Sequence, residues 1–393
     1  MHMDRVTDFV VVGGGIGGLA TALQIARRRL GRVTVLERAE EFGEVGAGLQ
    51  LAPNASRVLD ELGVLEDVRK TAFMPGRLLL RDAISGEEIT ALRTDQTFVD
   101  RFGYPYMVAH RVDLHRALLD ACIAESAVEL RPGTTVLGAE QNSSGATVRA
   151  EGATFSADAV IGADGITSTI RQQLMGDGAP VGTGYVAYRG TVSRAEVRRS
   201  GDDVSDMVIW IGPSMHLVQY PVRGGELLNQ VAVFRSDKHG TGADDWGTSE
   251  ELDDRFSIAA GPVRRGVARV NRNQRWEMFD REPRSGWSKG RIALLGDAAH
   301  PMFQYLAQGA CQALEDSQVL ADCLEGSVDV ADALQAYEAQ RFGRASTVQT
   351  RARLFGEVLH AGGTLASMRN YLLRRRDDTD FEPVEWLYAS ADA

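Results

Sequence analysis

The first residues that could do chemistry are three glycines near the start of the chain, Gly13, Gly15 and Gly18, in a G-x-G-x-x-G pattern. They follow a continuous apolar run at residues 8–12, typical of a buried parallel strand, and a helical pattern opens at Ile16. Glycine permits a sharp turn, lets the backbone approach a pyrophosphate and lets the helix pack closely on the strand, while the helix N-terminus contributes a positive dipole end. The segment therefore predicts a dinucleotide site, in which we include Ile16.

An acidic residue, Glu37, stands at the carboxyl end of the second predicted strand, residues 33–36. Strand, helix and strand in this order form a βαβ unit. A carboxylate at this point can accept hydrogen bonds from the hydroxyls of an adenosine ribose. We therefore expect Glu37 to bind the dinucleotide, with Arg38 beside it.

Two aspartates follow further apolar runs. Asp164 comes after residues 159–161 and precedes Gly165, and Asp297 comes after residues 292–295. Each aspartate–glycine pair could on its own be only a turn. Their order and their equivalent positions at the ends of buried strands favour ligand binding instead.

A histidine in the middle of the chain is the candidate base. His216, Val218 and Tyr220 alternate along residues 212–222, so they share one face of a predicted strand. On periodicity alone, a histidine on an apolar strand is more often structural than catalytic. The seven histidines show no metal-ligand spacing, and we expect no metal site.

The composition excludes several classes of protein. A net charge of −11 argues against sequence-independent binding of nucleic acid. Three cysteines without a C-x-x-C pair argue against a disulfide framework or a zinc site and fit a reducing cytosol. No stretch is long and apolar enough for a transmembrane helix. We therefore expect a cytoplasmic protein.

The elements that must position these residues are predicted to form a discontinuous α/β domain around an α+β insertion. The Rossmann-like dinucleotide domain takes residues 1–76, 101–180 and 285–350, the substrate domain takes 77–100 and 181–284, and a C-terminal helical region and tail take 351–393. We expect that last region to support a homodimer.

Patterns within these segments predict individual elements. Residues 77–93 read as a hairpin, and alternation over residues 181–235 predicts an antiparallel sheet. Helical patterns cover residues 249–271, 309–324 and 329–358.

In combination, the motifs resemble those of the class A flavoprotein aromatic hydroxylases, the single-component FAD-dependent monooxygenases. Three family motifs occur in order: Gly13-x-Gly15-x-x-Gly18, Asp164-Gly165 and Gly296-Asp297-Ala298-Ala299-His300-Pro301. The similarity covers roughly residues 5–350. It implies a 4-hydroxybenzoate-hydroxylase-like fold with FAD as the cofactor.

The resemblance also implies roles for residues around the flavin. Asp297 would bind the ribityl chain, and Asp164 would bear on both FAD and the nicotinamide nucleotide. Arg111 matches the family arginine that lies along the flavin, and Gly48 belongs to the loop beside the isoalloxazine ring. Gln308-Gly309 opens a helix whose N-terminus would stabilise negative charge on the reduced flavin. His300 is expected to be structural.

In such enzymes NADH or NADPH reduces FAD, oxygen adds at flavin C4a, and the hydroperoxide transfers an oxygen atom to an aromatic ring. A phenolate is a better nucleophile than a phenol, so the site needs a base or acceptor beside the phenolic hydroxyl. His216 is the natural candidate. Gln304, where many relatives carry proline, adds a hydrogen-bonding side chain above the flavin.

A histidine with tyrosine four residues on, and glutamine in that loop, resembles the 3-hydroxybenzoate 6-hydroxylases. By this resemblance His216 and Gln304 assist deprotonation of the phenol and Tyr220 orients the substrate, while Tyr104 and Tyr106 are weaker pocket candidates. The predicted reaction converts 3-hydroxybenzoate to gentisate.

The alternatives are a salicylate hydroxylase, giving catechol or gentisate, a hydroxynicotinate-type hydroxylase and, from another class, a flavin-dependent reductase without oxygen insertion. The choice of NADH or NADPH stays open, as does the residue that binds the substrate carboxylate.

Overall fold

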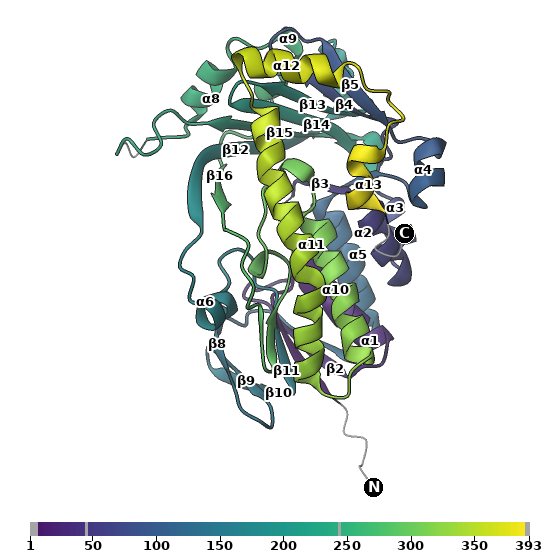
Figure 1. Ribbon diagram of the computed structural model, residues 1–393, viewed down its shortest axis with the longest axis vertical. Helices are drawn as coiled ribbons and strands as arrows, with labels where there is room; N and C mark the ends of the chain where they lie inside the picture. Colours follow the sequence, from purple (N-terminus) through teal and green to yellow (C-terminus); the bar gives the residue numbers. More distant parts are fainter. Residues whose placement is uncertain (1–6, 44–45, 243–244, 390–393) are drawn as a thin grey trace.

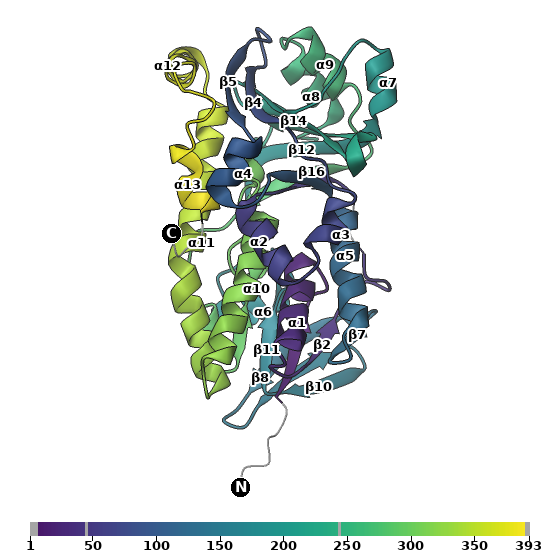
Figure 2. The same ribbon diagram turned by 90° about the vertical axis from the view of Figure 1, so that its right-hand side faces the viewer.

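Two sheets, one above the other along the long axis, organise the molecule (Figure 1). The computed structural model describes residues 7–43, 46–242 and 245–389. A six-stranded sheet lies in the lower half and a seven-stranded sheet in the upper half, and the long helix α11 (Val330–Leu359) runs beside both (Figures 1 and 2). The α/β class with a sheet-containing insertion is confirmed, whereas the exact domain boundaries remain a prediction.

The lower sheet is the Rossmann-like sheet that the sequence predicts. Every neighbouring pair of strands in it runs parallel except the short edge pair. Its strands, in spatial order, are β17 (Ser288–Lys289), β18 (Ile292–Leu294), β11 (Ala159–Gly162), β1 (Asp8–Val12), β2 (Arg32–Leu36) and β7 (Val128–Arg131). The first helix after β1, α1 (Ile16–Arg27), packs between α5 (Arg111–Ala124) and α10 (Gly309–Glu325).

The direction of these strands brings distant residues together. Gly13 and Glu37 directly follow β1 and β2. Asp164 follows β11 after Ala163, and Asp297 follows β18 after Leu295 and Gly296. Because the four strands are parallel, their carboxyl ends meet at one edge of the sheet, where α/β folds bind ligands. The strand-end reasoning from the sequence therefore places these residues correctly.

The upper sheet joins the residue 77–93 hairpin to the later strands. In spatial order it consists of β16 (Arg275–Asp280), β12 (Val181–Ser193), β15 (Leu227–Arg235), β14 (Met215–Val222), β13 (Met207–Gly212), β4 (Arg77–Asp82) and β5 (Glu88–Arg93). All neighbours are antiparallel except β13 and β4. The expected antiparallel sheet thus contains one parallel pair, because β4 reaches the sheet from a separate part of the chain rather than through a hairpin with β13.

One predicted helix is wrong in extent. Residues 249–271 form two short helices, α8 (Ser249–Phe256) and α9 (Gly261–Val267), with a break between them. Pro262 has no N–H to continue a helix, and the backbone N–H of Ala260 donates instead to the carbonyl of Ala83 at 2.7 Å. Helices α10 and α11 match the patterns at 309–324 and 329–358 within about one residue.

The remaining elements are short. Two further sheets pair β10 (Ala153–Ala157), β9 (Ala146–Ala150) and β8 (Val136–Gln141), and β3 (Gly48–Leu51) with β6 (Met107–His110). The other helices are α2 (Pro53–Glu61), α3 (Leu65–Arg69), α4 (Gln96–Phe102), α6 (Thr169–Met175), α7 (Arg194–Arg199), α12 (Gly363–Leu373) and α13 (Glu382–Tyr388). Within the described ranges, no helix combines the length and the apolar character needed to cross a membrane.

Candidate active site

A cavity of about 440 Å³ opens at the carboxyl edge of the lower sheet, and most of the predicted dinucleotide residues line it. These are Gly13, Gly15, Ile16, Glu37, Arg38, Arg111, Asp164, Asp297 and Gly309. We call it the nucleotide cavity. Residues from both ends of the chain therefore share one wall, as the sequence predicts.

The glycines of the first motif leave room that a side chain would fill. Gly13 has a φ of +110°, and a Cβ atom there would lie 2.3 Å from the carbonyl oxygen of Ala163. At Gly18, in the first turns of α1, a Cβ would lie 1.9 Å from the carbonyl oxygen of Gly13. Gly18 thus acts by close helix–strand packing, and the bare backbone at Gly13 fits a pyrophosphate.

The two acidic strand-end residues also fix the backbone around the cavity. Glu37 accepts hydrogen bonds from the N–H groups of Gly14 at 2.8 Å and Ala39 at 2.9 Å. Asp164 accepts from the hydroxyl of Ser168 at 2.5 Å and from the N–H of Thr169 at 2.7 Å, at the start of α6. Burial raises the pKa of Asp164, although these hydrogen bonds oppose the shift.

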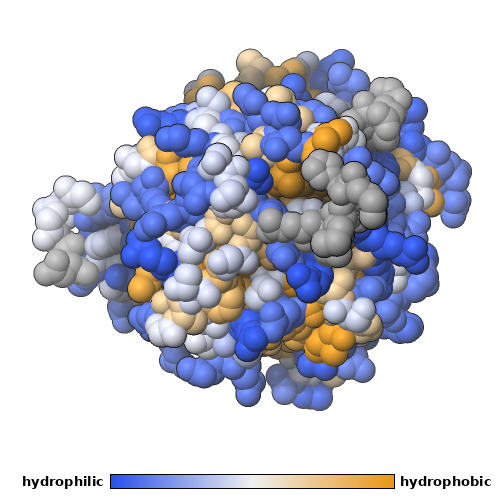
Figure 3. Space-filling model, turned by 90° about the horizontal axis from the view of Figure 1, so that it is seen from below, coloured by the Kyte–Doolittle hydropathy of each residue, from blue (hydrophilic) through white to orange (hydrophobic). Residues whose placement is uncertain are grey.

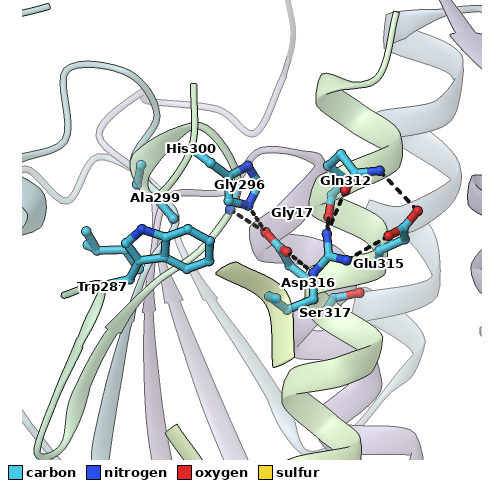
Figure 4. A network of polar contacts seen from close by, with 12 residues as sticks. Gly17, Trp287, Gly296, Ala299, His300, Gln312, Glu315, Asp316 and Ser317 are labelled. Carbon is cyan, nitrogen blue, oxygen red and sulfur yellow. Dashed lines mark hydrogen bonds and ion pairs between the residues drawn. The ribbon is translucent and has the colours of Figure 1, made fainter. Parts of the chain in front are cut away.

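A buried ionic network holds the turn at Gly296, the residue before Asp297, in place (Figure 4). Asp316 on α10 accepts from the backbone N–H of Gly296 at 2.9 Å, from His300 Nε2 at 2.6 Å and from Arg341 Nε of α11 at 2.6 Å. Burial alone would raise the pKa of Asp316, but His300 and Arg341 outweigh it and hold that pKa well below its usual range. His300 thus contacts the carboxylate that holds the turn, which is consistent with the structural role expected for it. Nothing in the local sequence pattern signals Asp316 or Arg341.

A second cavity, of about 560 Å³, lies under the upper sheet, and we call it the substrate cavity. Gly48, His216, Tyr220 and Gln304 all line it. Its walls are mainly apolar and come from the upper sheet, α11 and the segment around α13. It shares Arg111, Asp297, Gly309 and Ala310 with the nucleotide cavity, so the two spaces meet at these residues.

His216 has a partner that sequence reasoning missed. Its Nδ1 lies 2.7 Å from Nε2 of His360, just beyond the end of α11, and both rings are buried. Burial, and to a lesser degree His360, lowers the pKa of His216 well below its ordinary value. Burial lowers the pKa of His360 to about 4, with Arg369 contributing. Both imidazoles are therefore neutral at neutral pH, and Nε2 of His216 is the ring nitrogen left for a ligand.

Tyr220 and Gly48 fit against each other. A Cβ at Gly48 would lie 2.5 Å from the ring of Tyr220, so a larger residue would displace that ring. The backbone N–H of Gly48 donates to Oδ1 of Asn229 at 2.8 Å. Tyr106 also lines the substrate cavity, whereas Tyr104 donates to Asp60 at 2.8 Å.

Gln304 is held by an arginine that sequence reasoning did not select. Nη2 of Arg189, on β12, lies 2.7 Å from Oε1 of Gln304. A guanidinium can only donate, so the amide NH₂ of Gln304 is the group left for a ligand. Gln308 has a different place: its Oε1 accepts from Asn54 at 3.0 Å and Gln312 at 3.1 Å in a buried network.

Residues 6–352 match the family model described as FAD binding domain. The chain is 41% identical over 395 residues to a 3-hydroxybenzoate 6-hydroxylase of Klebsiella oxytoca, covering 98% of this chain and 97% of the relative. Among solved structures, HpxO of Klebsiella pneumoniae complexed with FAD and uric acid is 27% identical, with a TM-score of 0.81 and coverage of 96% and 94%. A salicylate hydroxylase substrate complex is 25% identical, with a TM-score of 0.78 and coverage of 99% of each chain.

The bare backbone at Gly13, the dipole end of α1 and the carboxylate of Glu37 fit the pyrophosphate and ribose of a dinucleotide, while Asp297 stands where the two cavities meet. The chain therefore belongs to the FAD-binding-domain family and is one of its flavoprotein aromatic hydroxylases.

Proposed function

We propose that the chain hydroxylates 3-hydroxybenzoate para to its hydroxyl group, giving gentisate, with O₂ and NADH or NADPH as cosubstrates. The observation that carries this proposal is the neutral, buried His216 on the wall of an apolar cavity that meets the nucleotide cavity. The full-length similarity to a 3-hydroxybenzoate 6-hydroxylase supports it. Salicylate and hydroxynicotinate substrates are less well supported.

FAD, when bound, supplies the oxidising chemistry that inserts oxygen into the ring. The task of the chain is to raise the electron density of that ring. His216 accepts the phenolic proton at Nε2, because its Nδ1 is engaged by His360. The NH₂ group of Gln304 then donates a hydrogen bond to the phenolate oxygen. The negative charge formed beside His216 favours its protonated state at that moment.

The remaining walls position the ring and exclude water. Tyr220 and Val218 lie on the same strand face as His216, and Met207 and Ile209 of β13 extend the apolar surface. Exclusion of water strengthens each polar contact within the cavity and protects the oxidising species from wasteful breakdown.

The direct test is product analysis. Purified protein saturated with FAD is incubated with NADH, oxygen and 3-hydroxybenzoate, and the expected product is gentisate. Formation of hydrogen peroxide alone would overturn the substrate assignment. Parallel incubation with salicylate separates the alternatives, because catechol indicates decarboxylative hydroxylation.

Labelled oxygen distinguishes a hydroxylase from a reductase. With ¹⁸O₂, gentisate should gain one labelled oxygen atom, as mass spectrometry would reveal. A reductase without oxygen insertion would oxidise NADH and leave every ring product unlabelled.

We also propose a cytoplasmic enzyme whose partners are the small aromatic acid, O₂ and the nicotinamide nucleotide. The net charge of −11 and the three free cysteines, Cys122, Cys311 and Cys323, support that view. No nucleic-acid partner is expected.

A further inference from the structure

One cation at the substrate cavity lacks an acidic partner. Arg189 lines the cavity, donates from Nη2 to Gln304 and lies over the ring of Trp276 with its Cζ 5.4 Å from the centroid. Its Nε is buried without a hydrogen-bond partner, and its guanidinium forms no ion pair with any residue the structure describes. Burial lowers the pKa of Arg189; Tyr220 opposes this shift, and the nearby Arg111 adds to it.

Two arginines that are more fully buried than the part-buried Arg189 pair with carboxylates. Arg171 pairs with Asp177 at 2.6 Å, and Arg341 pairs with Glu315 at 2.7 Å and with Asp316 at 2.6 Å. A buried cation without an anion carries an uncompensated desolvation cost. An anionic ligand at Arg189 would supply the missing negative charge and offset this cost.

Strand register fixes where this cation lies relative to the histidine. Arg189 of β12 pairs with Val231 of β15, which pairs with Val218 of β14. His216 lies two residues before Val218 on β14, so its side chain is on the same face. Two strand spacings separate β12 from β14, roughly 10 Å between backbones. The cation and the histidine therefore project from the same face of the sheet, at separate points on the wall of the cavity.

We propose that Arg189 binds the carboxylate of the aromatic acid while His216 faces its phenolic hydroxyl. Two groups on different strands would then hold the two polar ends of one ring, and the ring could present only one edge to the flavin. The identity of the ring rests on the proposed function, whereas the need for an anion rests on Arg189 alone.

The test compares an acid with its neutral isostere. Holoenzyme without NADH is titrated with 3-hydroxybenzoate and with 3-hydroxybenzamide, and binding is followed by the change in flavin absorbance. The unsubstituted protein should bind the acid at least about 30-fold more tightly, as expected for a charge-assisted hydrogen bond. Arg189→Gln should lose that preference while its affinity for the amide changes less than about 3-fold. Arg189→Lys should retain part of the preference.

Arg81 offers a matched control. Its Cζ also lies 5.4 Å from a tryptophan centroid, that of Trp210, but it pairs with Glu88 and is absent from the described wall of the cavity. Arg81→Gln should keep the preference for the acid. Equal weakening of acid and amide in Arg189→Gln would mean that Arg189 only supports Gln304. If Arg189→Gln weakens the binding of phenol but not of benzoate, Arg189 contacts the phenolic oxygen instead of the carboxylate. Either result overturns the proposal.

Failure of the proposed substrate can be told apart from failure of Arg189. If 3-hydroxybenzoate leaves the flavin spectrum of the unsubstituted protein unchanged, the substrate is wrong, and the same comparison is made with salicylate and 6-hydroxynicotinate against their amides. An Arg189-dependent preference for either acid supports the anion site. The absence of any such preference overturns it.

Discussion

At the residue scale, the histidine pair carries most of the proposed chemistry. His216 is placed by β14 and His360 by the end of α11, so their 2.7 Å contact joins residues 144 positions apart. A neutral imidazole has one donor and one acceptor nitrogen. In the tautomer whose Nδ1–H donates to Nε2 of His360, Nε2 of His216 is the proton acceptor. The pair therefore presents an orientated base to an apolar space.

Replacing the base should separate the two halves of the reaction. His216→Ala should slow hydroxylation about 10²- to 10⁴-fold, because general base assistance is lost, while reduction of the flavin by NADH changes little. Rapid-mixing absorbance for reduction and product analysis for hydroxylation give the two rates. Val218→Ala, on the same strand face, is the control for altered cavity shape. Equal losses in both half-reactions would point to a structural role for His216.

The same burial makes stability depend on pH. His360 titrates near its ordinary value of 6.5 in the unfolded chain and at about 4 in the folded protein, so between these values the unfolded state binds more protons. Its contribution to folding is complete above pH 6.5 and is lost as the pH falls toward 4, by about 1.4 kcal/mol per pH unit. Between pH 6 and pH 4.5, the free energy of unfolding of His360→Gln should fall with decreasing pH less steeply than that of the unsubstituted protein. The difference in slope should be about 1.4 kcal/mol per pH unit. Urea titrations across this range measure it, and an unchanged slope would contradict the assignment.

The sequence predicts residues well where a local rule applies and poorly where a partner lies far along the chain. Gly13, Glu37 and Asp297 follow from the position of ligand residues at strand ends. By contrast, the contact of Arg189 with Gln304 spans 115 positions, and the one between His216 and His360 spans 144. No periodicity in a single sequence encodes such pairs.

At the element scale, the turn between β1 and α1 controls cofactor binding. Gly13→Ala should abolish retention of FAD, since the added Cβ meets the Ala163 carbonyl and φ is +110°. The ratio of flavin to protein absorbance after gel filtration measures retention. Gly43 also lines the nucleotide cavity, but a Cβ there has no described neighbour within 4 Å, so Gly43→Ala should stay yellow. A flavin-saturated Gly13→Ala protein would show that the turn tolerates a side chain.

Elements with one strong pattern were predictable, and elements set by distant packing were not. The apolar runs of β1, β11 and β18 identify buried parallel strands directly. The parallel pairing of β13 with β4 depends on contacts with other parts of the chain. The break between α8 and α9 has a local signal in Pro262, but the Ala260–Ala83 hydrogen bond that accompanies it is also a distant contact. Propensity alone cannot anticipate these contacts.

At the scale of the whole molecule, the distribution of apolar surface bears on the predicted homodimer. The face seen from below is mainly hydrophilic, with hydrophobic residues scattered over it (Figure 3). Helix α12, at the opposite end, exposes Leu365, Met368, Tyr371 and Leu372 (Figures 1 and 2). Helical spacing puts the first, second and fourth on one stripe, which a second copy of the chain could cover.

The dimer prediction can be tested at that stripe. Light scattering during gel filtration should give the mass of two chains for the unsubstituted protein and of one chain for Leu365→Asp/Leu372→Asp. Leu137→Asp, at an exposed leucine on β8, should leave the mass unchanged. A protein that elutes as one chain in every case would exclude the homodimer.

Helix α11 fixes the distance and the angle between residues that support the two cavities. Arg341 on its body secures the support beneath Asp297, and His360 just past its end supports His216. Its 30 residues span roughly 45 Å, and backbone hydrogen bonds fix both the rise and the angle between those two side chains. One residue inserted between them would turn the far end by about 100° relative to the near end. The number of residues between Arg341 and His360 therefore sets the orientation of His360 relative to Arg341.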